Sequence, residues 1–140
     1  MSIFFHEEDL PEGLNFEGPV AVDTEAMGLH PHRDRLCLVQ LSDGRGDEHL
    51  IRFGKGSAYS APNLEALLGD PERLKLYHFA RFDVAMIQAY LGFMVGVGEA
   101  VDCDVGALLA KCRQPFERKF RRRFAVLFSD YPQQRCPELS

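Results

Sequence analysis

A change in hydrophobic period near residue 60 constrains the fold of this chain more than any other feature. Three short β-rich segments precede it, at Val20–Val22, Leu36–Leu41 and His49–Phe53. The connections between them are polar or contain glycine, and Leu36–Leu41 is almost entirely apolar, as expected for a strand covered on both faces. Three strands in succession with short connections predict an antiparallel meander.

Beyond residue 60 helical and strand-like segments alternate. A short helix is predicted at Leu64–Leu68, where Asn63 can act as its cap, followed by a strand at Leu74–His78 and a helix at Phe82–Leu91. A weak strand near Val101 and a helix over residues 104–110 continue the pattern. The chain is therefore predicted to be an α/β protein with a mixed five-stranded sheet, antiparallel in its first three strands, then parallel, flanked by helices.

Composition narrows the class of protein. With 140 residues, 46 % of them hydrophobic and 26 % charged, the chain fits one globular domain. No apolar run approaches the ~20 residues that a membrane span needs. The first ten residues carry Glu7, Glu8 and Asp9 where a secretory signal would carry positive charge. We expect a soluble cytoplasmic protein with no membrane partner.

Charge is distributed unevenly along the chain. Residues 1–110 hold eight basic and eighteen acidic residues, whereas residues 111–140 hold eight basic and three acidic ones. An acidic body argues against a sequence-specific DNA binder, which presents a strongly basic face. The pattern fits a body whose acids hold cations and a tail that contacts phosphate, or simply a solvated basic tail.

Asp23-Thr24-Glu25 directly follows the first predicted strand. Side chains two residues apart on a strand share a face, so the two carboxylates would lie close together. Such a pair is costly unless a cation lies between its members or water reaches them. The alternative is a solvated strand end before the turn at Gly28.

A third acid, Asp83, lies where the fourth predicted strand passes into the long helix. If the first and fourth strands are parallel, they end at the same edge of the sheet, and Asp83 then faces Asp23 and Glu25. Three convergent carboxylates form a hard-oxygen site suited to Mg²⁺ or Mn²⁺. The alternative for Asp83 is a first-turn carboxylate that interacts with the helix dipole.

These residues carry a family resemblance. The run Val20–Leu29 resembles the first motif of ribonuclease D and its relatives in the DEDD superfamily of 3′–5′ exonucleases. Asp34–Ser42 is similar to the second strand of that family, and His78–Asp83 to its second motif. The likeness extends from about Val20 to Leu109.

The resemblance implies a ribonuclease H-like fold and a two-metal hydrolysis of the 3′-terminal phosphodiester of single-stranded RNA, or of DNA. By position, Asp23 would bridge two Mg²⁺ or Mn²⁺ ions, Glu25 would hold the ion that activates water, and Asp83 would help to hold the other. The segment that would pack against the terminal nucleotide is Met27, Gly28 and Leu29. His78 could approach the substrate, or it could be a strand-end histidine with no such role.

The third motif of the family is absent. A Tyr or His four residues before an Asp on a later helix supplies the fourth metal ligand and the group that positions the water. No acid after Asp83 has such a partner. We therefore expect an incomplete exonuclease-like domain over residues 1–112 and a divergent basic segment over residues 113–140.

Three hypotheses follow. The first is a ribonuclease D-like exonuclease with weak or lost activity. The second is a non-catalytic module of the same fold that binds nucleic acid or a protein partner. The third is a structural α/β domain with solvated carboxylates. Because the absent final helix would have covered apolar surface, self-association into a homo-oligomer is also expected.

Overall fold

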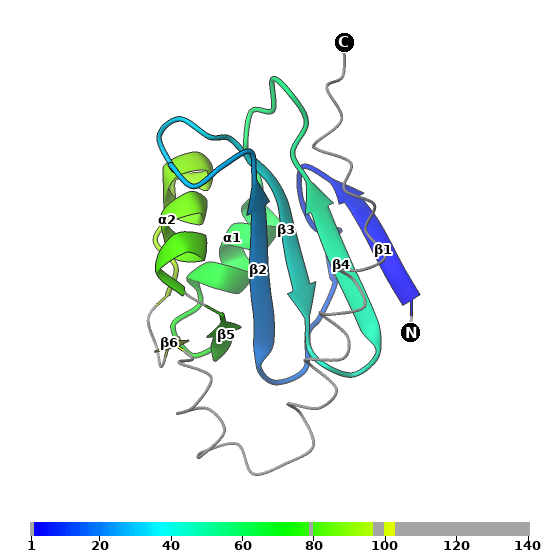
Figure 1. The fold of residues 1–140 in the computed structure, drawn as a ribbon. Helices are drawn as coiled ribbons and strands as arrows, with labels where there is room; N and C mark the ends of the chain where they lie inside the picture. The colour runs from blue at the N-terminus through cyan, green and yellow to red at the C-terminus, as the bar shows by residue number, and fades with distance from the viewer. Residues whose placement is uncertain (1, 79, 97–99, 103–140) are drawn as a thin grey trace.

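A six-stranded mixed sheet forms the centre of the molecule in the computed structural model, which describes residues 2–78, 80–96 and 100–102 (Figure 1). The elements, in chain order, are β1 (Ser2–Glu7), β2 (Val20–Ala26), β3 (Leu36–Ser42), β4 (Asp47–Arg52), α1 (Pro62–Gly69), β5 (Lys75–Tyr77), α2 (Ala80–Leu91) and β6 (Ala100–Asp102). The strand order is β1-β4-β3-β2-β5-β6. β2, β3 and β4 are antiparallel neighbours, whereas β5 is parallel to β2 and β6 to β5. The predicted mixed α/β sheet is confirmed; the predicted helix over residues 104–110 and the basic segment 113–140 lie outside the described residues.

The sheet has one strand more than the five predicted. β1 pairs in parallel with β4, from Ser2 opposite Asp47 to Glu7 opposite Arg52. The acidic residues at positions 7–9 gave this stretch a polar character in the sequence, although Ile3, Phe4 and Phe5 carry β propensity. Its partner lies more than forty residues further along the chain, a long-range pairing that local pattern does not reveal.

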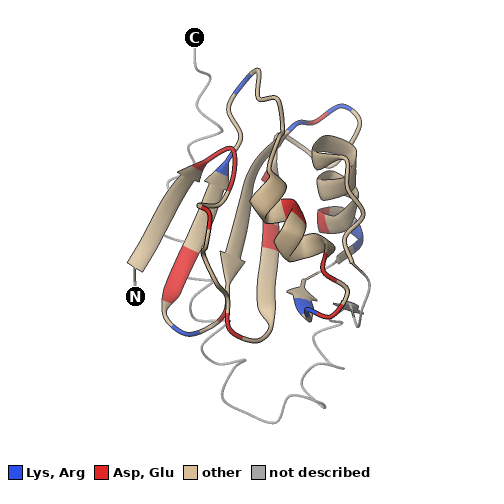
Figure 2. Ribbon diagram, turned by 180° about the vertical axis from the view of Figure 1, so that it is seen from behind, with Lys and Arg blue, Asp and Glu red and all other residues tan. Residues whose placement is uncertain are grey.

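Both described helices pack on the same face of the sheet (Figures 1 and 2). On this face the core joins alternate strand residues such as Val22 and Leu41 to Leu64 of α1 and Met86 of α2. All four side chains are almost fully buried. The alternation places the side chains of Ala21, Asp23 and Glu25 on the opposite face of β2.

The first turn of α1 is capped by a residue far away in sequence. Asp9 accepts hydrogen bonds from the backbone nitrogens of Asn63 and Leu64, both at 2.9 Å. The predicted cap, Asn63, instead lies inside the helix and donates its side-chain amide to the Leu10 carbonyl. Pro62 begins the helix, a position where its missing N–H costs nothing.

No helix in the described part of the chain is long and apolar enough to cross a membrane.

Candidate active site

β2 extends further than its apolar residues predicted, and this determines where its carboxylates lie. The strand runs through Ala26, so Asp23 and Glu25 belong to the strand and project from one face of it. Asp23 is half-buried and Glu25 is exposed. In the antiparallel register Asp23 lies directly opposite Gln40 of β3, and Glu25 lies opposite Leu38.

Asp83, in the first turn of α2, is attached to β2 by Thr24. Its Oδ1 accepts a hydrogen bond from the Thr24 backbone nitrogen at 3.0 Å and another from Thr24 Oγ1 at 2.6 Å. The Val20 nitrogen donates to Leu74, just before β5, so even-numbered amides of β2 point toward β5. β5 ends at Tyr77, and the Asp83 carboxylate satisfies the Thr24 amide beyond that end.

The sequence did not assign a role to Thr24. The sequence feature that could have pointed to Thr24 is its place between two acids. Thr24 is a β-branched residue with a hydroxyl group, and it lies on the face of the strand that packs against the helices. Asp83 therefore lies beside the strand that carries Asp23 and Glu25, while the convergence of the three carboxylates stays a prediction.

The three carboxylates influence one another electrostatically. Burial raises the pKa of Asp23 to about 7, and the neighbouring Asp83 contributes to the rise. Burial likewise raises the pKa of Asp83 to about 6, against the opposing effect of its hydrogen bonds from Thr24, with a further rise caused by Glu25. Although the Glu25 residue is exposed, its carboxyl is partly desolvated, which raises its pKa, and the Asp23 charge raises it further. A nearby divalent cation would offset this repulsion.

The positions of the side chains support a metal site less strongly than their charges do. Within the described residues, no group of three or more His, Cys, Asp or Glu side chains is arranged so that it could hold a metal ion. One oxygen of Asp83 is occupied by Thr24. The donor chemistry, three carboxylates on one strand–helix junction, fits a hard cation such as Mg²⁺. That Asp23, Glu25 and Asp83 bind it together remains a prediction.

The predicted substrate segment follows β2 directly. Met27 and Leu29 are exposed, by 57 % and 80 %, so both are available for contact. Gly28 lies against Asp34, and a Cβ at this position would be 2.2 Å from the Asp34 carboxylate. That carboxylate is in turn held by the His30 backbone nitrogen and by Arg33. His78, at the end of β5, is exposed. A role for these residues in binding substrate remains a prediction.

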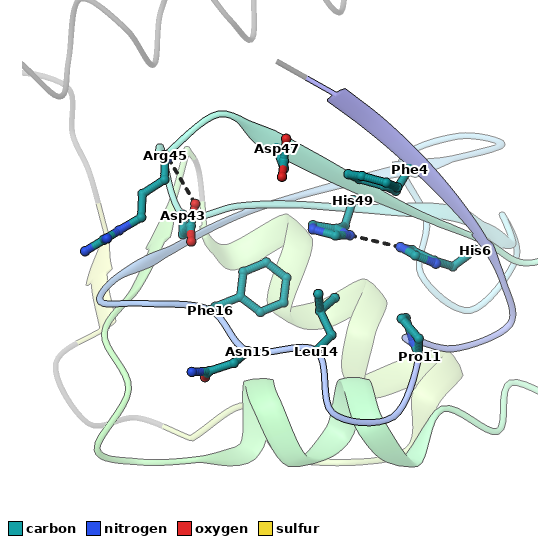
Figure 3. Close-up of a pocket in the computed structure, with 10 residues that line it drawn as sticks. All are labelled: Phe4, His6, Pro11, Leu14, Asn15, Phe16, Asp43, Arg45, Asp47 and His49. Atoms are coloured by element: carbon teal, nitrogen blue, oxygen red, sulfur yellow. Dashed lines mark hydrogen bonds between the residues drawn. The ribbon is translucent and has the colours of Figure 1, made fainter.

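A cavity of about 370 Å³ lies elsewhere, beside the edge of the sheet formed by β1 and β4 (Figure 3). His6 and His49 share a hydrogen bond of 2.9 Å between their rings, and Phe4 stacks on His49. Burial lowers the pKa of both histidines, which favours their neutral forms. None of the predicted site residues lines this cavity.

Acidic residues occur on β2, β4, both helices and several loops, whereas basic residues lie mainly in loops and near the ends of elements (Figure 2). The junction of β2 and α2 thus brings acidic residues of two elements together on an α/β sheet.

Comparison with known proteins identifies the family. The family model described as 3′-5′ exonuclease matches residues 4–128. This chain therefore belongs to the 3′–5′ exonuclease family, and its sheet is the ribonuclease H-like fold expected from the sequence.

One curated protein and two solved structures illustrate what the chain is similar to. The chain is 31 % identical over 99 residues to ribonuclease D of Gluconacetobacter diazotrophicus, a match that covers 71 % of this chain and 24 % of that protein. It superposes on Brucella melitensis NrnC with a TM-score of 0.64 and 47 % identity, over 68 % of this chain and 47 % of that one. A structure of Brucella melitensis NrnC with bound Mg²⁺ gives a TM-score of 0.66 and 27 % identity. That match covers 97 % of this chain and 87 % of the NrnC chain. In the first NrnC match, the chain thus spans about half the length of its relative.

Proposed function

We propose that this chain is a ribonuclease D-like 3′–5′ exonuclease domain that hydrolyses the 3′-terminal phosphodiester of single-stranded RNA with two divalent cations. The observation that carries the proposal is the junction of β2 and α2, where Thr24 holds Asp83 beside the strand of Asp23 and Glu25. Further support comes from the NrnC structures, one solved with Mg²⁺ and another bound to pGG.

Each carboxylate has a distinct proposed role. Asp23 would bridge two Mg²⁺ or Mn²⁺ ions, Glu25 would hold the ion next to the attacking water, and Asp83 would help to hold the second. Bound cations of this kind stabilise the attacking and leaving oxygens of a phosphodiester. Thr24 fixes the Asp83 side chain, and Met27 and Leu29 offer exposed apolar surface to the terminal nucleotide.

The rate is expected to be low. No Tyr or His stands four residues before an acid in the sequence after Asp83, so the pattern that would supply a water-orienting group and a fourth metal ligand is not found there. Orientation and metal charge supply much of the acceleration in such reactions. We expect turnover several powers of ten below that of Brucella melitensis NrnC assayed alongside. A cytoplasmic location stays an expectation from the sequence.

A second function is a non-catalytic RNA- or partner-binding module of the same fold. Two observations favour it: the absence of the third motif, and the absence, among the described residues, of three side chains arranged to hold a metal.

The test uses a 5′-labelled single-stranded oligoribonucleotide with Mg²⁺ or Mn²⁺ and follows its shortening on a gel. We expect slow shortening from the 3′ end, lost in Asp23→Asn and on chelation. Glu65→Gln, which changes an exposed acid on α1, is the matched control and should keep the wild-type rate. If the protein binds the RNA but does not shorten it at any metal concentration, the result would favour the binding module. The same oligonucleotide as DNA decides between the two substrates.

A further inference from the structure

Gln40 is a buried polar residue in a strand that is apolar apart from Gln40 and Ser42. Only 6 % of its surface is exposed, and β3 is buried along its whole length. Its side-chain Nε2 has no hydrogen-bond partner among the described residues. A buried donor without an acceptor costs about 1–3 kcal/mol, so an amide kept in this position needs a compensating role.

The register of the sheet restricts the acceptors that this amide can reach. Gln40 lies directly opposite Asp23 on one side and Leu50 of β4 on the other. Side chains of opposed residues share a face, with Cβ atoms about 4.5–5.5 Å apart. Of the two opposite neighbours, Asp23 alone is an acceptor. Glu48, diagonally placed on β4, accepts a hydrogen bond of 2.9 Å from Ser42 at Oε1. Its Oε2 is the acceptor that competes with Asp23, and the experiment below distinguishes the two.

We propose that Gln40 is a positioning residue for the metal site: its Nε2 donates a hydrogen bond to the Asp23 carboxylate when a divalent cation is bound. This inference rests on the proposed function. The bond leaves the remaining Asp23 oxygen lone pairs for the cations and fixes the rotamer of the carboxylate that would bridge them. Such outer partners of metal ligands orient them and are typically worth 10–100-fold in metal affinity or activity.

Mn²⁺ titration of the full chain by calorimetry, together with thermal melting, tests the inference. Gln40→Met removes the donor and keeps the length of the side chain. Gln88→Met is the matched control, because Gln88 is exposed on α2. We expect Gln40→Met to weaken Mn²⁺ binding at least 10-fold while its metal-free melting temperature stays equal or rises. Gln88→Met should bind Mn²⁺ as the wild type does.

The outcomes separate this inference from the proposed function. Wild-type Mn²⁺ affinity in Gln40→Met, with the wild-type chain itself binding, would overturn the role of Gln40 and leave the proposed function intact. A lower metal-free melting temperature with unchanged affinity would also overturn it, and would assign the amide to a structural contact such as Glu48. A wild-type chain that binds no Mn²⁺ would overturn both.

Discussion

The burial of Asp23 beside other carboxylates makes the stability of the folded chain depend on pH. Its pKa is about 7 in the folded state, above its ordinary value of 3.8. A carboxyl that holds its proton more tightly when folded stabilises the fold as the pH falls from about 7 toward 4, and destabilises it above 7. His6 and His49 act in the opposite direction because burial lowers their pKa values.

The difference in the free energy of unfolding between the wild type and Asp23→Asn isolates the contribution of Asp23. Without metal, we expect Asp23→Asn to be more stable than the wild type at pH 8, by on the order of 2 kcal/mol. The gap should shrink as the pH falls below 7 and close near pH 4, close to the ordinary pKa of the carboxyl. Urea unfolding at several pH values measures it, with Glu65→Gln as control. If Asp23→Asn were less stable at every pH, Asp23 would be a structural hydrogen-bond acceptor rather than a repelled carboxylate.

Thr24 and Asp83 give a second prediction at this scale. Thr24→Val keeps the shape of the side chain but removes the hydroxyl that donates to Asp83, which is only 2 % exposed. We expect a loss of about 1–3 kcal/mol in the free energy of unfolding at pH 8, where Asp83 is ionised. Thr24→Ser, which keeps the hydroxyl, should lose less. Equal unfolding free energies for the Val and Ser variants would show that the backbone amide alone holds Asp83.

At the level of elements, α1 depends on a cap from outside its own sequence. Asp9→Ala removes the acceptor for two backbone amides of the first turn. We expect a loss of about 0.5–2 kcal/mol, the usual cost of removing a cap. Thermal melting of Asp9→Ala beside Glu12→Ala, an exposed acid nearby, measures the effect. Equal melting temperatures for Asp9→Ala and Glu12→Ala would show that Asp9 does not stabilise the helix as a cap.

The elements that were predicted and those that were missed show which parts of the fold a local sequence pattern can predict. Hydrophobic period located β2, β3, β4, β5 and both helices, because each buries side chains at its own repeat. Motif spacing predicted Asp23, Glu25 and Asp83 as site residues, because their types and separations are visible in the sequence. β1 and the Asp9 cap were missed because their partners lie more than forty residues away.

Thr24 and Gln40 could not be assigned from the sequence for a different reason. Their importance depends on which residue faces them across the sheet or from α2, and only the register decides that. A one-residue shift in pairing would turn the side chains of β3 to the other face.

At the scale of the whole molecule, the layers formed by the described residues are asymmetric. α1 and α2 cover one face of the sheet (Figure 1), while Asp23, Gln40 and Leu50 share a row on the other. β1 continues that row with Phe5, which is 65 % exposed, and Ile3 on the same face is 41 % exposed. β1 is also an edge strand of the described sheet. Exposed apolar side chains on a strand edge favour pairing with another chain.

Self-association through β1 is the last prediction. We expect sedimentation of the wild-type chain to show concentration-dependent association, and Phe5→Lys to weaken it at least 10-fold, because a charge on an edge strand opposes pairing. The control is Met94→Lys, at another exposed apolar residue, which is 67 % exposed on the segment after α2. Melting temperatures of both variants establish that they remain folded. Association that is equally strong in Phe5→Lys, or that is lost equally in Met94→Lys, would show that β1 is not the contact and would direct attention to another surface.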